Sequence, residues 1–425
     1  MTVQISRLSN GMRVVTERMP RVETVALGVW VTAGSRHERE QEHGISHLLE
    51  HMAFKGTTRR SARAIAEEIE QVGGDLNAAT SIEMTSYYAR ILKGDVRLAL
   101  DILADILLDP RLDPDELARE QEVVLQEIAG ARDSPDDVAY DLAQEAAFSG
   151  QAIGRPILGT PESVSGITVR DLKAFLKRWY TPERMVIGAA GQVDHAVVVR
   201  HAEALFGGLD RKSTPSRAKA RWVGGTRASP RSFEQSHLIV GFEGPSYRDR
   251  DFFAAQVLSG LLGGGMSSRL FQEVRERRGL AYSIYSSCWG LDDTGMFSVH
   301  AATGPSSMTE LIDVVGHELN RVAAERAQPS EVQRAKAQLK AGLLMSLESP
   351  GARAEQIARQ VIVHNRVLDT EELVQRVDAV SADRVRSAAE GLLANREPSI
   401  ALVGVGRRGK TLSARAVERL GTVMA

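Results

Sequence analysis

Hydrophobic and polar positions follow two different periods along the chain, which indicates a mixture of helices and strands. Runs of β-branched and apolar residues at 24–32 and 185–191 predict strands, the first long enough for a central place in a sheet. Two adjacent strands are expected at 76–81 and 85–92, joined by a turn near residues 81–83. Apolar residues at helical spacing predict helices, which lie at 62–72, 94–108, 113–131 and 196–206.

The second half of the chain repeats features of the first. When Pro114 is aligned with Pro329, the same offset aligns Ser134 with Ser349 and Gly191 with Gly406. A single repeat at this length predicts two homologous domains rather than a solenoid. We therefore expect an α+β fold in which each domain is a mainly antiparallel sheet flanked by helices. The expected boundaries are 1–208 for the first domain, 209–232 for a linker rich in Arg and Lys, and 233–425 for the second domain.

Composition and charge exclude several classes of protein. A chain of 425 residues is too long for one ordinary core. Its net charge of −2 gives no case for binding nucleic acid or an anionic membrane, and no stretch approaches the roughly 18 apolar residues of a membrane span. From residues 1–20 we expect no secretory signal, and the single cysteine, Cys288, excludes an intramolecular disulfide. We expect a soluble cytoplasmic protein in which Cys288 is a small buried hydrophobe.

The segment His47-Leu48-Leu49-Glu50-His51 carries the clearest chemistry. Its apolar neighbours recur at helical spacing, so a helix ending near Gly56 is expected. Residues four apart lie one turn above each other, so His47 and His51 project from one face, as two ligands of one metal ion must. Glu50 is close enough to that face to act on a water molecule there. The order is the inverted form of the His-Glu-x-x-His zinc motif.

The internal repeat indicates which residues of this motif the fold needs and which it does not. Aligning the two halves here places Leu48 and Leu49 on Leu261 and Leu262, so these two leucines are expected to serve packing. The same alignment places the three polar residues on glycines, which are Gly260, Gly263 and Gly264. The fold therefore does not require His47, Glu50 or His51.

A catalytic zinc ion takes three protein ligands, so a third ligand is needed. The helix after Pro114 offers Glu120, Glu122 and Glu127. Glu120 and Glu127 are two turns apart and share a face, whereas Glu122 is typical of a solvated surface. Helical geometry alone leaves the choice among them open.

With these residues, the chain resembles the M16 metallopeptidase family, and within it the small-subunit branch of bacterial and mitochondrial processing peptidases. The resemblance also rests on Gly34-Ser35-Arg36, Phe54-Lys55-Gly56-Thr57 and Ser268-Arg269-Leu270-Phe271. It implies that Glu127, which follows His51 at the spacing found in that branch, is the third ligand of one Zn²⁺ per chain. It implies further that Glu50 is the general base and that Glu120 supports a histidine ligand.

The resemblance also implies residues that hold a substrate. It places an exposed strand edge at Asn77, Ala78 and Ala79, where an extended peptide would pair with the backbone. It implies that Arg275 and Tyr282 of the second domain contact the bound peptide. Without the resemblance, the first three would be ordinary strand residues and Arg275 a charge on a helix surface.

The expected function is that of a zinc-dependent endopeptidase that hydrolyses short or unfolded peptides in an enclosed chamber. In the family, two chains of this size face each other around that chamber. Because this chain carries both the metal set and the Arg275 and Tyr282 pair, a homodimer is favoured over a heterodimer with a homologous subunit. The alternative is a non-catalytic subunit, or one active only beside a partner chain.

Overall fold

The computed structural model describes residues 3–212, 215–394 and 397–420. The chain forms two compact units, each built from three stretches of sequence. The first unit contains Met1–Ile128, Pro156–Ala218 and Met345–Leu368, and the second contains Ala129–Arg155, Lys219–Leu344 and Asp369–Ala425. The predicted boundaries 1–208, 209–232 and 233–425 divide the chain by sequence and stay a prediction. Residues 213 and 214 of the predicted linker lie outside the described residues.

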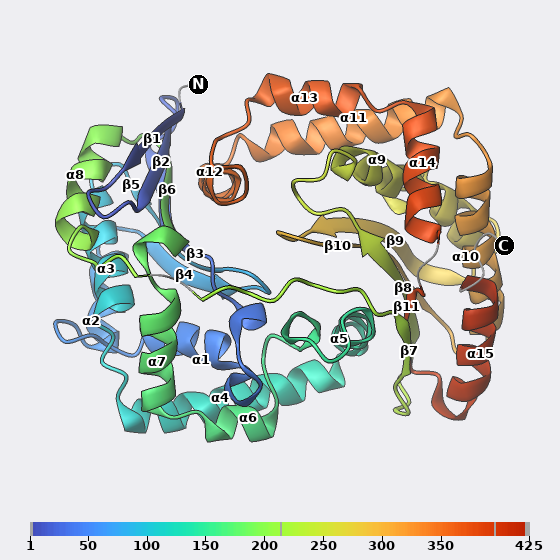
Figure 1. Cartoon of the computed structure of the whole chain (residues 1–425), viewed down its shortest axis with the longest axis horizontal. Helices are drawn as coiled ribbons and strands as arrows, with labels where there is room; N and C mark the ends of the chain where they lie inside the picture. The colour runs from blue at the N-terminus through green and yellow to red at the C-terminus, as the bar shows by residue number, and fades with distance from the viewer. Residues whose placement is uncertain (1–2, 213–214, 395–396, 421–425) are drawn as a thin grey trace. The chain divides into compact units, whose positions relative to one another are not determined.

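The first unit is built on a six-stranded sheet with the strand order β1-β2-β6-β3-β5-β4 (Figure 1). Its strands are β1 (Val3–Arg7), β2 (Arg13–Arg18), β3 (Thr24–Val31), β4 (Asp75–Thr80), β5 (Thr85–Leu92) and β6 (Met185–Gly191). Its helices are α1 (Ile45–Ala53), α2 (Ala62–Glu70), α3 (Val96–Leu108), α4 (Pro114–Asp133, which ends in the second unit), α6 (Pro161–Gly166), α7 (Val169–Trp179), α8 (His195–Phe206) and α12 (Pro350–His364).

Helices cover both faces of this sheet. On one face, apolar side chains of α1, α3, α7 and α8 share a continuous core with the strands. On the other face, the small and branched residues of α12, such as Ala354, Ile357 and Ala358, pack against Val15 and Trp30. The strands are therefore apolar on both sides, which explains why β3 and β6 read as unbroken hydrophobic runs.

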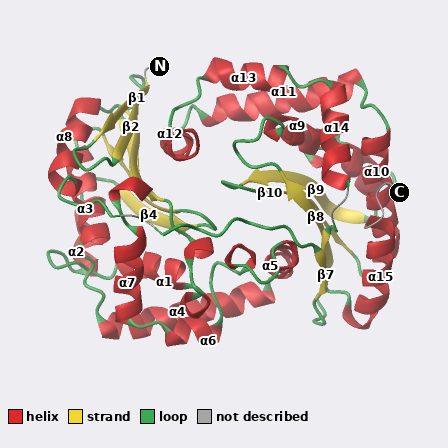
Figure 2. Cartoon of the chain, in the orientation of Figure 1, coloured by secondary structure: helices red, strands yellow, loops and turns green. Residues whose placement is uncertain are grey.

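The second unit contains a five-stranded sheet with the order β7-β11-β8-β10-β9. Its strands are β7 (Gly225–Ala228), β8 (Ser236–Gly244), β9 (Ala281–Gly290), β10 (Gly295–Thr303) and β11 (Ser399–Val403). Helices flank this sheet as well (Figure 2). They are α5 (Pro135–Ala147), α9 (Phe252–Gly263), a π-helix η5 (Phe271–Glu276), α10 (Met308–Ala324), α11 (Pro329–Ser346, which ends in the first unit), α13 (Thr370–Asp378), α14 (Ala382–Leu393) and α15 (Gly409–Leu420).

The two sheets confirm the predicted fold class of an α+β duplication. In each sheet one parallel pair, β2 with β6 and β7 with β11, is followed by antiparallel strands out to an edge strand, β4 or β9. Helices α4 and α11 both begin at a proline, and α5 and α12 both begin after a capping serine, as the alignment of the two halves predicts.

Individual elements lie close to their predicted positions. Strands β5 and β6 have the predicted bounds, and β3 is an inner strand between β5 and β6. Strand β7 lies inside the segment 209–232, so this part of the predicted linker belongs to a sheet.

Each unit also receives one helix from the other half of the sequence. Helix α5 follows the first repeat in sequence but packs on β8 and β11 of the second unit. Helix α12 follows the second repeat but packs on β2, β3 and β6 of the first unit. This reciprocal arrangement does not follow from periodicity, because periodicity shows which helix face is apolar and not which sheet it covers.

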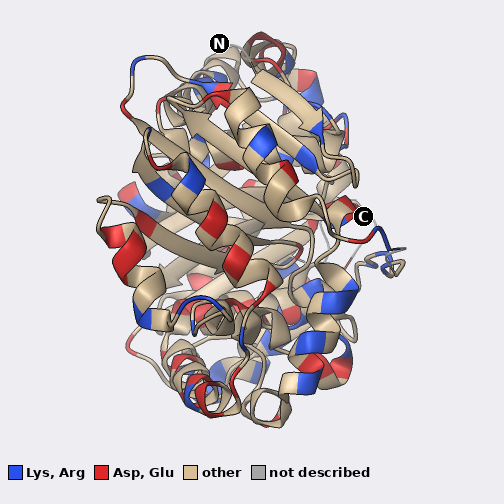
Figure 3. Ribbon diagram, turned by 90° about the vertical axis from the view of Figure 1, so that its left-hand side faces the viewer, with Lys and Arg blue, Asp and Glu red and all other residues tan. Residues whose placement is uncertain are grey.

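The surface chemistry agrees with the composition. In the view of Figure 3, basic and acidic residues are interspersed along the helices. None of the described helices is both long enough and apolar enough to cross a membrane. Cys288 is buried and has no disulfide partner, and burial raises the pKa of its thiol to about 12, as expected for a packing residue.

We predict that Arg353→Met destabilises the first unit by about 3 kcal/mol. Arg353 of α12 donates a hydrogen bond from its Nε to the carboxylate of Glu17 on β2, and both side chains are almost fully buried. Removing the guanidinium leaves a buried carboxylate without its charge partner. Urea denaturation measures the effect.

The double variant Glu17→Gln, Arg353→Met is the control, because it removes the charge that the single variant leaves behind. It should recover part of the lost stability. Equal stability of Arg353→Met and the unchanged protein would contradict the role of this pair in holding α12 on the sheet.

Candidate metal centre and peptidase site

Helix α1 carries the His47 motif, and its start is fixed by a turn that only glycine suits. Gly44, which precedes the helix, has a φ of 91°, and a Cβ there would lie 2.8 Å from the carbonyl oxygen of Leu158. The buried carboxylate of Glu38 accepts hydrogen bonds from the backbone N–H groups of Gly44 and Ser46. A carboxylate at a helix N-terminus satisfies free donors and complements the helix dipole, so the orientation of α1 is well determined.

Helix α1 has one buried apolar face and one half-buried polar face, as its sequence pattern predicts. Leu48, Leu49 and Met52 are buried in the core, whereas His47, Glu50 and His51 lie on the half-buried face. The imidazole rings of His47 and His51 are neighbours, with their centroids 4.7 Å apart.

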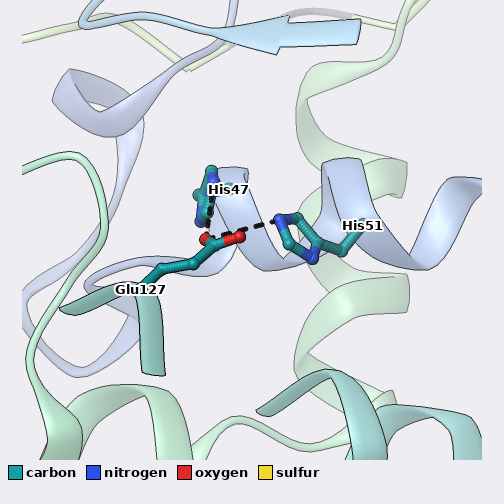
Figure 4. A group of neighbouring side chains, drawn as sticks. All are labelled: His47, His51 and Glu127. Atoms are coloured by element: carbon teal, nitrogen blue, oxygen red, sulfur yellow. Dashed lines mark ion pairs between the residues drawn. The ribbon is translucent and has the colours of Figure 1, made fainter. Parts of the chain in front are cut away.

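The structure brings Glu127 of α4 to these two rings (Figure 4). Oε2 of Glu127 lies 3.6 Å from Nε2 of His47 and 3.7 Å from Nε2 of His51. Donor atoms around a tetrahedral zinc ion are about 3.3 Å apart when the bonds are about 2.0 Å long. Two imidazoles and one carboxylate at nearly this spacing form a donor set that suits Zn²⁺ and leaves a fourth position open.

Glu120 occupies a different place from Glu127, although both lie on α4. Its Oε2 accepts a hydrogen bond from Nδ1 of His51 at 3.0 Å, and its Oε1 lies 2.7 Å from Nζ of Lys55. Burial alone would raise the pKa of Glu120, but the hydrogen bonds from Lys55 and His51 outweigh it and hold that pKa below its ordinary value. An ionised Glu120 keeps the His51 proton on Nδ1 and leaves the Nε2 lone pair facing Glu127.

Burial also sets the state of the other two polar residues on α1. It lowers the pKa of His47 to about 4, with a smaller contribution from His51, so His47 is neutral at pH 7. It raises the pKa of Glu50, against the opposing effect of a hydrogen bond that Thr80 donates to Oε2 of Glu50. The nearby carboxylate of Glu127 also raises the pKa of Glu50, which places the carboxylate of Glu50 beside the cluster.

The residues predicted to bind a peptide backbone lie on β4, which is an edge strand of the first sheet. Asn77 and Ala79 are exposed, and Ala78 is half-buried. Oδ1 of Asn77 accepts a hydrogen bond from the backbone N–H of Ala78 at 2.8 Å. The strand edge is therefore present where it is predicted, while its role in binding stays a prediction.

The remaining predicted residues, Arg275 and Tyr282, lie in the second unit. The guanidinium of Arg275, on η5, lies 5.3 Å from the ring centroid of Tyr282, at the start of β9, and 4.8 Å from that of Phe271. Tyr282 is 77% exposed, which is unusual for a large aromatic residue. The two side chains form one cation–π pair, and their contact with a substrate stays a prediction.

Two residues that contact the site, Lys55 and Thr80, were not predicted from the sequence. Lys55 follows His51 by four residues and lies just after the end of α1, so the sequence already places it near the motif. Thr80 is the second residue after Ala78 on β4 and therefore shares the strand face that meets α1. The sequence positions of Lys55 and Thr80 do not predict that Lys55 contacts Glu120 or that Thr80 contacts Glu50, because each contact joins distant parts of the chain.

The second unit shows what the same framework looks like without the polar cluster. A Cβ on Gly260, the counterpart of His47, would lie 3.4 Å from Cβ of Ala335, the counterpart of Glu120. A Cβ on Gly263, the counterpart of Glu50, would lie 2.4 Å from the backbone nitrogen of Ser286 on β9. Small residues thus close the space that the polar side chains occupy in the first unit.

Comparisons with known proteins identify the family of the chain and a counterpart of its fold. Residues 13–161 match the family model described as insulinase (peptidase family M16), and residues 166–339 match the one described as the peptidase M16 inactive domain. An uncharacterized zinc protease of Streptomyces coelicolor is 38% identical over 412 residues, which cover 95% of this chain and 90% of that protein. One of Bacillus subtilis is 37% identical over 384 residues, covering 90% of this chain and 94% of that protein.

The fold has a counterpart among solved structures. The crystal structure of a protease from Helicobacter pylori matches with a TM-score of 0.87 over 95% of this chain and 99% of that chain, at 22% identity. The chain belongs to the M16 peptidase family, as the inverted motif and the duplication predict.

We predict that Glu120→Gln weakens the binding of Zn²⁺ about 10- to 100-fold. The amide does not carry the charge that holds the His51 proton on Nδ1, and it breaks the ion pair with Lys55. Competition with a chromogenic chelator measures the affinity.

Glu122→Gln is the matched control, because Glu122 is exposed on the same helix. Its zinc affinity should equal that of the unchanged protein. The positioning role of Glu120 fails if both variants bind zinc equally tightly.

Proposed function

We propose that this protein is a zinc-dependent endopeptidase that uses His47, His51 and Glu127 to hold one catalytic ion. The observation that carries the proposal is the convergence of two Nε2 atoms and one carboxylate oxygen from α1 and α4. The relatives named zinc proteases support the choice of ion. When bound, Zn²⁺ polarises the carbonyl of the peptide bond and lowers the pKa of a water molecule to about 7.

The residues of the chain divide the remaining work. Glu50 takes a proton from the attacking water on its carboxylate and passes it to the leaving amine, as a general base and then a general acid. Its raised pKa makes it a stronger base than an ordinary glutamate. The hydrogen bond from Thr80 fixes one of its oxygens, and Glu120 fixes the orientation of His51.

The edge of β4 supports the substrate class. An extended peptide can add to an exposed strand edge through backbone hydrogen bonds, which select an unfolded chain rather than a particular sequence. The amide of Asn77 occupies the N–H of Ala78, so an incoming peptide would exchange this local bond for its own carbonyl. The family resemblance adds an enclosed chamber that admits short or unfolded peptides, formed by two copies of the chain.

We predict that Glu50→Gln lowers peptide cleavage about 10²- to 10⁴-fold while zinc stays bound. The amide cannot accept the proton, but Glu50 is not among the three donors. Cleavage of a pool of unfolded peptides is measured together with zinc content, with sequencing of the products. His51→Ala, by contrast, should lose both the catalytic ion and the activity, and a chelator should abolish cleavage by the unchanged protein.

Two outcomes would point elsewhere. If the zinc-loaded protein cleaves no unfolded peptide and Glu50→Gln changes nothing, the peptidase proposal fails in favour of a non-catalytic subunit. If cleavage appears only after a homologous chain is added, the protein is a subunit of a heterodimer rather than a self-sufficient homodimer. Light scattering gives the mass of the active species, and mass spectrometry of its chains distinguishes the two kinds of dimer.

We predict that Arg275→Ala lowers kcat/KM about 10- to 100-fold without loss of zinc, as expected for a charged hydrogen bond to substrate. Peptide hydrolysis and metal content of the same sample measure the two effects. Arg277→Ala is a neighbouring control, because Arg277 pairs with Glu273. A parallel loss of zinc in Arg275→Ala would contradict a role in substrate binding.

A further inference from the structure

A second group of metal-binding side chains lies in the second unit. Oδ1 of Asp136 lies 3.2 Å from Nδ1 of His237 and 3.1 Å from Nε2 of His300. The two nitrogens are 3.3 Å apart. All three residues belong to the same compact unit.

Strands β8 and β10 and helix α5 bring the three side chains together. In the pairing of β8 with β10, His300 lies opposite Ile239, so His237 is its diagonal neighbour on the same sheet face. Asp136 is in the first turn of α5, and α5 packs on β8. Three regular elements therefore hold the cluster, and none of the three ligand candidates lies on a loop.

The spacing is that of donors around one ion. The three edges of the triangle, from 3.1 to 3.3 Å, match the roughly 3.3 Å between donors of a tetrahedral ion with bonds of about 2.0 Å. The corresponding distances from Glu127 in the first unit, 3.6 and 3.7 Å, are slightly wider.

Hydrogen bonds alone do not satisfy this triangle. Three such bonds need three protons, but each neutral imidazole carries one N–H and the carboxylate carries none. Both rings are 2% exposed, which disfavours the charged forms with additional protons. The outer nitrogens, Nε2 of His237 and Nδ1 of His300, are buried and have no hydrogen-bond partner among the described residues. A cation accepts all three inner lone pairs at once.

The surroundings favour a bound ion with one open side. The ring of Tyr140 stacks on His300 with centroids 5.7 Å apart, and the ring of Tyr285 lies 4.8 Å from His300. The two tyrosine hydroxyls are hydrogen-bonded at 2.7 Å. The Asp136 side chain is 56% exposed, which gives an ion a route from solvent.

We propose that Asp136, His237 and His300 form a second metal site, which takes Zn²⁺ or a similar first-row divalent cation and fastens α5 to the sheet of the second unit. Two imidazoles and one carboxylate suit such ions, whereas Ca²⁺ and Mg²⁺ prefer oxygen donors. The exposed Asp136 side chain leaves the site accessible to solvent. This site is separate from the proposed catalytic ion and adds to the expected one Zn²⁺ per chain.

Zinc stoichiometry tests the proposal. The full-length protein is loaded with Zn²⁺, freed of excess metal by gel filtration and analysed for zinc. We expect about two ions per chain in the unchanged protein, about one in His51→Ala, about one in His300→Ala, and none in the double variant. One ion in the unchanged protein, one in His300→Ala and none in His51→Ala would overturn the second site. One ion in the unchanged protein and none in His300→Ala would instead support the second site and contradict the proposed catalytic ion.

A surface variant guards against misfolding, because His300 is buried. In the His51→Ala background, Asp136→Ala should weaken the remaining zinc affinity at least about 10-fold, as loss of one of three ligands requires. It should also reduce the rise in melting temperature that a given concentration of added Zn²⁺ produces in this background. Asp137→Ala is the matched control, since Asp137 lies in the same first turn of α5. Equal zinc affinities of the Asp136→Ala and Asp137→Ala proteins would overturn the proposal.

Discussion

The hydrogen bond from Nδ1 of His51 to Glu120 is the interaction on which the proposed metal centre depends. A neutral imidazole can carry its proton on either nitrogen, and only one choice leaves a lone pair facing His47 and Glu127. Glu120 makes that choice, but a buried carboxylate would by itself tend to take up a proton. Lys55 prevents this through its contact with the other oxygen. The ligand geometry on α1 thus depends on a charge pair between α4 and the residues just after α1.

A comparison of the two duplicated units shows how the polar cluster changes the packing around it. In the second unit, Gly260 and Ala335 let the two corresponding helices approach closely, and Gly263 meets the backbone of β9. In the first unit the same positions hold the half-buried His47 and Glu50 and the buried Glu120, all of which need hydrogen-bond or metal partners. Packing is retained where the two units agree, at Leu48 and Leu49 and at Leu261 and Leu262. The second unit therefore has small residues packed together at these positions, whereas the first unit has polar side chains there.

Local patterns predicted most of the elements, because strands such as β5 and β6 and helices such as α4 are bounded by turns, caps and periodicity that act over a few residues. The paired histidines followed from helical geometry alone. The choice of Glu127 over Glu120 needed the family spacing, since both lie on one face of α4, and the structure separates them by the nitrogen of His51 that each approaches. The crossing of α5 and α12, the contacts of Lys55 and Thr80, and the cluster of Asp136, His237 and His300 depend on tertiary contacts between distant segments. No local period records them.

In the proposed function, strand β4 would join substrate recognition to proton transfer. Its outer edge, at Asn77 to Ala79, is an edge of the sheet, and Thr80 at its end donates a hydrogen bond to Glu50, the proposed base. Residues of one strand move as a rigid group, so a peptide that pairs with this edge would be placed in a fixed relation to the carboxylate that accepts the proton. The second sheet has an edge strand at the same place, β9, but there the position of the base is Gly263. Shared strand geometry could therefore serve binding in either unit, whereas the proposed proton transfer would be confined to the unit whose strand end meets a glutamate.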